Sequence, residues 1–195
     1  MKNSTKGGGG EAYLNSIFAF GDSEIMIDCG AFTGDTALKF AQYCKTYRKI
    51  YAFEPDQISY QKLIKNTQNL NITPFQKGVS SRSDTLSFDI QDSGCSNFNK
   101  KGKLQIQVEA IDSLLKIENQ PITFIKMDIE GSELEALRGA KQTIQKYKPK
   151  LAICIYHRKE DLITIPQYIK SLHPDYKIFI RNHQQIPEDT VLYAY

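Results

Sequence analysis

The stretch IMIDCGAFTGDTALKF, residues 25–40, decides the fold of this chain. Its first three residues form an apolar run of the kind found in buried strands, and Asp28-Cys29-Gly30 closes that run. Between residues 36 and 47 the apolar side chains recur at helical spacing, which predicts a helix. A strand, a turn that holds Gly30 and Gly34, and a helix together form the first half of a βαβ unit.

The same alternation of short apolar runs and helical stretches continues along the chain. Further strands are predicted at residues 50–53, 73–79, 122–129 and 151–156, and further helices at 58–69 and 133–147. Strands that alternate with helices of this length favour right-handed crossovers and a parallel sheet covered on both faces. The fold class is therefore α/β, with a mostly parallel central sheet.

Two segments depart from this rhythm. Residues 85–88 and 104–108 alternate apolar and polar side chains with a period of two, which predicts an inserted antiparallel β-hairpin. At the other end of the chain, residues 176–180 and 190–193 are predicted to form a second antiparallel pair at the edge of the sheet.

The helix predicted at residues 133–147 has a marked start. Ser132-Glu133-Leu134-Glu135 matches the capping box, in which the serine oxygen accepts an amide hydrogen bond and Glu135 reaches back to the cap. Inside the helix, Gly139 costs about 1 kcal/mol relative to alanine. Its presence predicts that another segment packs closely against the helix at that point.

Composition and charge exclude several classes of protein. The chain has 195 residues, of which 41% are hydrophobic and 24% charged, which is enough for one domain with a packed core. Its 25 Lys+Arg against 22 Asp+Glu leave a net charge of +3, so we expect neither a nucleic-acid partner nor an anionic membrane partner. No apolar run approaches the roughly 20 residues of a membrane span.

Residues 1–10 are predicted to be a flexible glycine-rich leader that precedes one domain over residues 11–195. Four glycines at residues 7–10 lose much backbone freedom when ordered. The leader has no apolar segment of the secretory type. The cysteines show no CxxC spacing, which favours free thiols and a cytoplasmic location; they are Cys29, Cys44, Cys95 and Cys154.

Polar residues follow four predicted strands at their carboxyl ends. They form the segments DCGAFTGD (28–35), EPD (54–56), KMDIEG (126–131) and Tyr156-His157. The carboxyl ends of parallel strands meet at one edge of a sheet, where doubly wound folds bind ligands. Taken singly, each segment also fits a tight turn, a solvated acid, a structural ion pair or a surface histidine. Together they favour a nucleotide-like cofactor.

The spacing of these residues selects among such cofactors. Gly30 and Gly34 let the backbone approach a ligand, and the helix that follows offers free amides. Glu54 lies 24 residues beyond Gly30, close to the roughly 20-residue spacing at which an acid accepts both ribose hydroxyls. A dinucleotide would require G-x-G-x-x-G, whereas this turn is G-x-x-x-G with Phe32 inside it. An acid-rich site of this kind suits the amine and sulfonium of S-adenosylmethionine.

Three of these segments resemble the FkbM-type methyltransferases. They are DCGAFTGD (28–35), FEPD (53–56) and IKMDIEGSE (125–133), of which the segment around Asp128 is the most specific. The resemblance covers about residues 11–195. It implies a Rossmann-like class I methyltransferase fold with a terminal antiparallel strand, S-adenosyl-L-methionine as cofactor, and methylation of hydroxyl groups on sugars or polyketide-like products.

The resemblance also implies positions for the cofactor. The turn after the first strand would hold its methionine end, Glu54 its ribose, and the segment after the third strand would lie near its adenine. The expected cofactor-binding residues are Asp28, Gly30, Ala31, Gly34, Asp35, Thr36, Glu54, Pro55, Gly78, Val79 and Asp128. The acceptor is expected to be a small molecule or a glycan, and its identity and the oligomeric state are left open. Glu11 and Tyr13 either close over the cofactor as a lid or belong to a surface segment.

A hydroxyl acceptor has to lose a proton, so a base should help by roughly 10²–10⁴-fold. Histidine titrates nearest to neutral pH, and His157 is therefore assigned as the base. Asp128 is assigned to positioning and Glu130 to acceptor binding. Lys126, in a buried strand, is expected to pair with one of these two acids. No metal site is assigned.

Two other classes of function compete with methyl transfer. A non-catalytic cofactor-binding module used for interaction would keep Glu54 and Gly30 but would need neither His157 nor Glu130. A nicotinamide-dependent oxidoreductase is disfavoured by Phe32 and by the G-x-x-x-G spacing. Product formation on acceptor molecules distinguishes the enzyme from the binding module.

Overall fold

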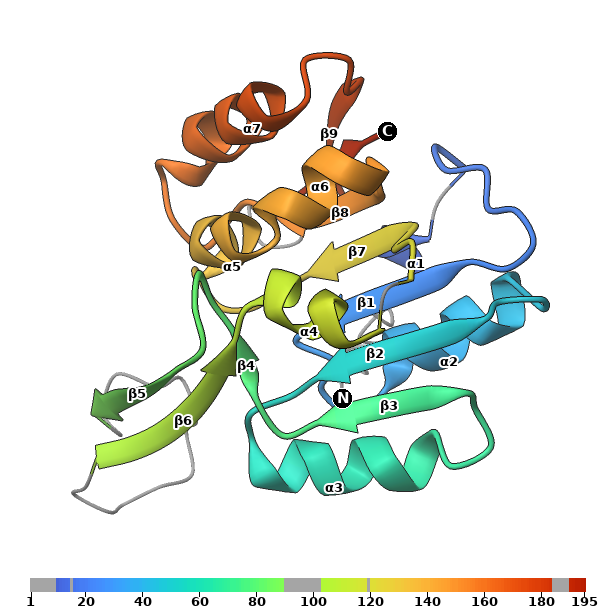
Figure 1. Cartoon of the computed structure of the whole chain (residues 1–195), viewed down its shortest axis with the longest axis vertical. Coiled ribbons are helices and arrows are strands. Elements are labelled where there is room, and N and C mark those ends of the chain that lie inside the picture. Colours follow the sequence, from blue (N-terminus) through green and yellow to red (C-terminus); the bar gives the residue numbers. More distant parts are fainter. Residues whose placement is uncertain (1–9, 15, 90–102, 119, 184–189) are drawn as a thin grey trace, which may run out of the picture.

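The computed structural model of the chain describes residues 10–14, 16–89, 103–118, 120–183 and 190–195 (Figure 1). Seven strands form one sheet in the order β3-β2-β1-β7-β8-β10-β9. These strands are β1 (Ile25–Cys29), β2 (Lys49–Phe53), β3 (Ile72–Phe75), β7 (Phe124–Met127), β8 (Lys150–Cys154), β9 (Ile178–Asn182) and β10 (Thr190–Ala194). The first five are parallel to one another, and β10 is antiparallel to both β8 and β9. The predicted α/β class and terminal antiparallel pair are confirmed.

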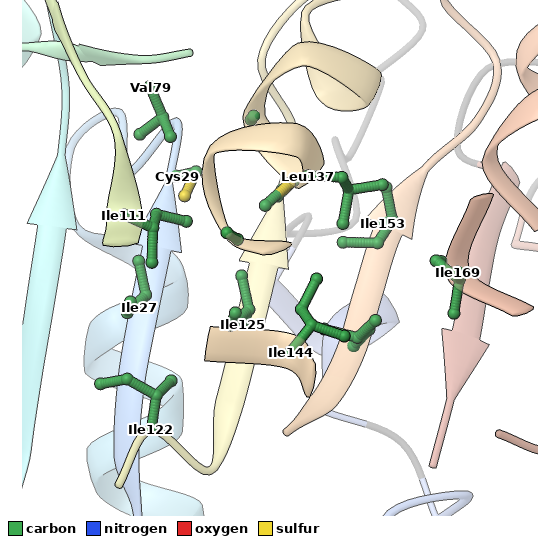
Figure 2. Packing of buried hydrophobic residues seen from close by; sticks show 14 of the residues in the cluster. Ile27, Cys29, Val79, Ile111, Ile122, Ile125, Leu137, Ile144, Ile153 and Ile169 are labelled. Atoms are coloured by element: carbon green, nitrogen blue, oxygen red, sulfur yellow. The ribbon is translucent and has the colours of Figure 1, made fainter. Parts of the chain in front are cut away.

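Helices cover both faces of this sheet because its strands present apolar side chains on alternate sides. Ile27, Ile125 and Ile153 face one helical layer, which Figure 2 shows through Leu137 and Ile144. Met26 and Phe124 belong to the core on the opposite face. The helices are α1 (Gly10–Tyr13), α2 (Asp35–Tyr43), α3 (Gln57–Asn66), α4 (Ile111–Glu118), α5 (Glu133–Gly139), α6 (Lys141–Tyr147) and α7 (Asp161–Leu172).

A second sheet of three strands lies beside the main one, in the order β4-β6-β5 (Figure 1). Strands β5 (Asp84–Asp89) and β6 (Lys103–Glu109) pair antiparallel, which confirms the inserted hairpin; the loop between them lies outside the described residues. The prediction of a single strand at 73–79 is wrong. That segment divides into β3 of the main sheet and β4 (Gly78–Val79), which pairs with β6.

The long helix predicted at residues 133–147 is also divided. Ala140, with φ −106° and ψ 9°, ends α5 and precedes α6. The predicted capping box is wrong, because the Ser132 side chain makes no cap hydrogen bond and Glu135 pairs instead with Arg138. Glu133, the first residue of α5, is the acid that reaches back, and its Oε1 accepts the N–H of Ile129 across 2.9 Å.

Other boundaries differ less. The helix predicted at 36–47 ends at Tyr43, and the sequence pattern did not reveal α4 or α7. Cys29, Cys44 and Cys154 are buried free thiols, as expected; Cys95 and residues 1–9 of the predicted leader lie outside the described residues. None of the helices in the described ranges has the length and apolar character needed to cross a membrane.

Gly139 sits where α5 packs against the segment that follows β4. A Cβ atom on this residue would lie 2.0 Å from the carbonyl oxygen of Ser80 and 3.2 Å from the Cα of Ser81. Both neighbours are backbone atoms, which cannot rotate away as a side chain would. The predicted close approach is therefore confirmed.

We expect Gly139→Ala to destabilise the protein although alanine is the better helix former. Overpacking against a fixed backbone costs about 1–3 kcal/mol, which outweighs the gain of about 1 kcal/mol in helix propensity. Urea unfolding followed by circular dichroism measures the change. Lys141→Ala, at an exposed position on α6, is the matched control, and equal stability of the two variants would contradict the packing argument.

Candidate active site

The carboxyl ends of β2, β1, β7 and β8 lie next to one another, as the strand-end segments predicted. The backbone continues the ladder beyond the strands: Gly30 N–H donates to Phe53 O across 3.0 Å, and Asp128 N–H donates to Cys29 O across 3.1 Å. In Figure 1 the arrowheads of β2, β3 and β7 point to this edge, on the side of the smaller sheet. All the polar segments singled out in the sequence therefore reach one rim.

The glycine turn after β1 is shaped by its neighbours. Gly30 has φ +78°, and a Cβ there would lie 1.9 Å from the carbonyl oxygen of Asp128. Gly34 has φ +93°, and a Cβ there would lie 2.7 Å from Thr67 Cγ2. Phe32 between them is also left-handed, with φ 49°, and its side chain is exposed. The two glycines thus let the turn lie against the end of β7 and against α3.

Asp28 and Lys126 form a buried ion pair beneath this turn. Lys126 Nζ lies 3.1 Å from Asp28 Oδ1, and the two side chains are 3% and 0% exposed. The ammonium also donates to Gly30 O across 2.7 Å. Burial alone lowers the pKa of Lys126, but the carboxylates of Asp28 and Asp128 raise it. We expected Lys126 to pair with Asp128 or Glu130, but its partner is Asp28. This buried pair lies beneath the glycine turn.

Glu54 closes β2 and joins two loops. Its Oε2 accepts the N–H of Phe32 across 2.8 Å, and its Oε1 accepts the N–H of Asp56 across 2.9 Å. Burial raises the pKa of Glu54, and these two N–H groups oppose the rise. Because a carboxylate has about four acceptor positions, two remain for ribose hydroxyls. The residue therefore fits the role expected from the sequence.

The remaining expected cofactor residues lie around the same turn, except for Gly78 and Val79. Ala31 and Thr36 are buried, Pro55 is half-buried, and the exposed Asp35 accepts a hydrogen bond from Thr33 Oγ1 across 2.6 Å. Gly78 and Val79 lie in β4, and the Val79 side chain belongs to the hydrophobic core. A ligand at that position would therefore meet backbone rather than the Val79 side chain.

Asp128 is held by two tyrosines. Tyr13 Oη donates to Asp128 Oδ2 across 2.8 Å, and Tyr156 Oη donates to Oδ1 across 3.3 Å. Tyr13 is 5% exposed, and its ring lies 5.1 Å from Lys126 Nζ. Burial and the neighbouring Cys154 and Asp128 raise the pKa of Tyr13, so that the phenol is neutral. Tyr13 is therefore not part of an exposed surface segment, and its closure over the cofactor stays a prediction.

His157 lies among three carboxylates. Its Nδ1 lies 2.9 Å from Glu133 Oε1, and its Nε2 lies 3.5 Å from both Asp128 Oδ1 and Glu130 Oε2. Burial lowers the pKa of His157, whereas the close contact and charge of Glu133 and the charges of Asp128 and Glu130 raise it, and the net direction is upward. The imidazole is therefore a stronger base than an exposed histidine.

Two features of this group were not expected from the sequence. Glu130 does not continue the strand, because β7 ends at Met127 and Glu130 has φ 57° with a 91% exposed side chain. Glu133 was interpreted only as part of a helix start. Glu133 and His157 are too far apart in the sequence for a local pattern to link them. They come together because β7, which precedes Glu133, pairs with β8, which precedes His157.

Asp128, Glu133 and His157 each place one oxygen or nitrogen within 4.8 Å of the others, so they are the group of described residues that could bind a metal ion. Carboxylate and imidazole groups of this kind also occur without an ion, as a histidine held by acids. The absence of a metal site remains a prediction from the sequence.

The comparison with known families agrees with this geometry. Residues 28–184, which hold the glycine turn, Glu54, Asp128 and His157, match the family described as Methyltransferase FkbM domain. The chain belongs to this family.

Relatives of this FkbM domain are longer proteins. The crystal structure of a methyltransferase FkbM from Methylobacillus flagellatus is 35% identical with a TM-score of 0.78, over 94% of this chain and 46% of that one. The hexuronic acid methyltransferase AglP of Haloferax volcanii is 28% identical over 64% of this chain and 53% of its own length. The chain thus spans about half the length of these two relatives.

A more distant structure shows the shared fold. Fibrillarin from Aeropyrum pernix, solved with bound S-adenosyl-L-methionine, has a TM-score of 0.57 at 13% identity, over 94% of this chain and 73% of that one. The main sheet of the FkbM domain is therefore the Rossmann-like sheet of class I methyltransferases, as the resemblance implied.

We expect Lys126→Met to destabilise this FkbM domain by about 3–5 kcal/mol, because it leaves the buried carboxylate of Asp28 without its partner. The double variant Asp28→Leu/Lys126→Met removes both charges and should recover most of that loss. Denaturant unfolding measures both. Lys62→Met, at an exposed position, is the control, and a double variant no more stable than Lys126→Met would contradict the ion-pair explanation.

Proposed function

We propose that this FkbM domain transfers a methyl group from S-adenosyl-L-methionine to a hydroxyl group of a sugar or of another small-molecule or glycan acceptor. The observation that carries the proposal is the position of His157 Nε2, which faces Asp128 and Glu130 beside the glycine turn. A base at the cofactor rim is what a hydroxyl acceptor requires. The name of the relative AglP, a hexuronic acid methyltransferase, supports a sugar acceptor.

The residues at the rim suit this donor. Glu54 retains free acceptor positions for the ribose, and the nearby acids favour a positively charged group. Bound there, S-adenosyl-L-methionine supplies a methyl group already activated by its sulfonium. The protein then has to align the acceptor oxygen, exclude water and remove a proton.

Each side chain has a distinct part in that task. His157 takes the proton of the acceptor hydroxyl, and the surrounding carboxylates stabilise the imidazolium that forms. Asp128, fixed by Tyr13 and Tyr156, holds the acceptor or the donor in line. Glu130, whose side chain is exposed, contacts the acceptor.

The charge of the site favours a hydroxyl over a carboxylate as acceptor. Asp128, Glu130 and Glu133 surround one imidazole, so that an acidic acceptor group would meet like charge. A carboxylate acceptor also needs no base, and His157 would then have no proton to take. Absence of nucleic-acid and membrane partners and a cytoplasmic location remain predictions from composition and cysteine pattern.

Glu54→Gln should weaken the binding of S-adenosylhomocysteine by roughly ten- to a hundredfold. A hydrogen bond to a charged group contributes about 1.5–3 kcal/mol, and each 1.4 kcal/mol is tenfold in affinity. Isothermal titration calorimetry measures the dissociation constant, and circular dichroism verifies that the variant is folded. Glu135→Gln is the control. An unchanged affinity in Glu54→Gln would remove Glu54 from the cofactor site.

His157→Gln should lower turnover by about 10²–10⁴-fold while S-adenosylhomocysteine affinity stays within about twofold, since the base acts on the acceptor alone. Release of S-adenosylhomocysteine is measured on neutral methyl glycosides and on hexuronic acids, with His173→Gln as the control. Full activity in His157→Gln would contradict the assignment of the base. Donor binding with no product on any acceptor would favour the interaction module.

A further inference from the structure

The two ring nitrogens of His157 have different neighbours. Nδ1 lies 2.9 Å from Glu133 Oε1, which is within hydrogen-bond distance, although neither ring nitrogen makes a hydrogen bond of favourable angle in the described part of the chain. Nε2 faces Asp128 Oδ1 and Glu130 Oε2, each at 3.5 Å, which leaves this nitrogen without a short contact to either. The His157 side chain is 9% exposed, so that its orientation is set by these neighbours rather than by solvent.

Glu133 is held in place independently of His157. It is fully buried at the first position of α5, and its Oε1 accepts the N–H of Ile129 across 2.9 Å. Its Oε2 has no hydrogen-bond partner in the described part of the chain. A buried carboxylate without a full set of partners is costly, so its presence at this position calls for an explanation.

We infer that Glu133 is a positioning residue: its carboxylate accepts the Nδ1 proton of His157 and thereby presents Nε2 as the nitrogen that takes the proton from the acceptor. This inference rests on the proposed function. In the step itself, the hydroxyl proton moves to Nε2 while the acceptor oxygen bonds to the methyl carbon. The bond between that carbon and sulfur breaks, and the donor leaves as a neutral thioether.

The groups that face His157 act together on its charge. Glu133 contacts it from α5, Asp128 and Glu130 from the end of β7, and the Tyr156 ring lies 4.1 Å away, centroid to centroid. Beyond Glu133, burial and the charge of Glu133 raise the pKa of Asp161. Loss of the Glu133 charge should therefore lower the pKa of His157.

A metal ion bound by Asp128, Glu133 and His157 is the competing explanation of the same cluster. An imidazole offers one nitrogen to one ion. The short contact of Glu133 is with Nδ1, at 2.9 Å, whereas Asp128 lies 3.5 Å from Nε2. Histidines that are oriented by a carboxylate on the far nitrogen have this arrangement. Because one atom from each of the three residues also lies within 4.8 Å of the others, the Mn²⁺ measurement below separates the two explanations.

The first experiment needs no acceptor. Nitrogen-15 NMR of the whole chain, with His157 signals identified from His157→Gln, gives the tautomer and the pKa of His157. We expect the neutral ring to carry its proton on Nδ1. We also expect the pKa of His157 to lie above the usual 6.5 of a histidine. In Glu133→Gln the pKa should fall by about one unit or more, since an opposite charge at this distance shifts a pKa by about 1–3 units. Glu135→Gln should leave it unchanged.

The kinetic arm uses the acceptor found in the turnover assay. Because His157 must be neutral to accept a proton, activity rises with pH through its pKa, and the midpoint should move to lower pH in Glu133→Gln. The plateau kcat should fall about tenfold or more, with KM within about threefold. Glu133→Asp, which keeps the charge, should restore part of both effects.

Several results would overturn this inference: a neutral His157 protonated on Nε2, an unmoved pKa in Glu133→Gln, or Mn²⁺ that broadens the His157 signals at equimolar concentration and raises activity. The tautomer of the unaltered protein decides the matter even where Glu133→Gln does not fold. A chain that shows the expected tautomer and pKa shift but no methyl transfer would contradict the proposed function and leave the contact with Glu133 intact.

Discussion

Lys126 Nζ donates to the carbonyl of Gly30 across 2.7 Å and lies 3.1 Å from Asp28 Oδ1, and this buried contact ties the ends of β1 and β7 together. The close approach of the two ends is also why residue 30 has no side chain: the carbonyl of Asp128 occupies the space that a Cβ would need. Asp128 and the glycine turn are thus parts of one rigid unit. In the proposed function, the cofactor side of the site and its acceptor side meet at that point.

The site draws on both faces of the sheet. Asp128 and Tyr156 follow the side-chain alternation of the strands toward the core beneath α1 and α2, where Tyr13 joins them. His157 lies on the side of Ile155 and the helical layer that includes α5, which supplies Glu133. The two halves meet only beyond the strand ends, because the sheet itself separates them elsewhere.

Sequence patterns predicted those features of the fold and site that depend on local periodicity and on strand order. The buried runs, the hairpin, the terminal pair and the rim that collects Glu54, Asp128 and His157 all followed from apolar spacing and the parallel arrangement. Features that depend on contacts between distant segments did not. Three such features depend on how different elements pack against one another. They are the partner of Lys126, the break at Ala140 and the contact of Glu133 with His157. Glu133 looked like an ordinary helix-start acid because its partner, His157, comes after the end of β8 and is distant in the sequence.

Strand β10 begins at Thr190 and α1 ends at Tyr13, so both lie outside the segment 28–184 that matches the family. Yet β10 is an interior strand, paired with β8 on one side and β9 on the other, and α1 carries the phenol that donates to Asp128. A fragment cut at the ends of the matching segment would expose the ladder of β8 and leave Asp128 with one donor fewer. The segment that forms the complete sheet and all the described contacts of Asp128 is therefore longer than the segment that matches the family.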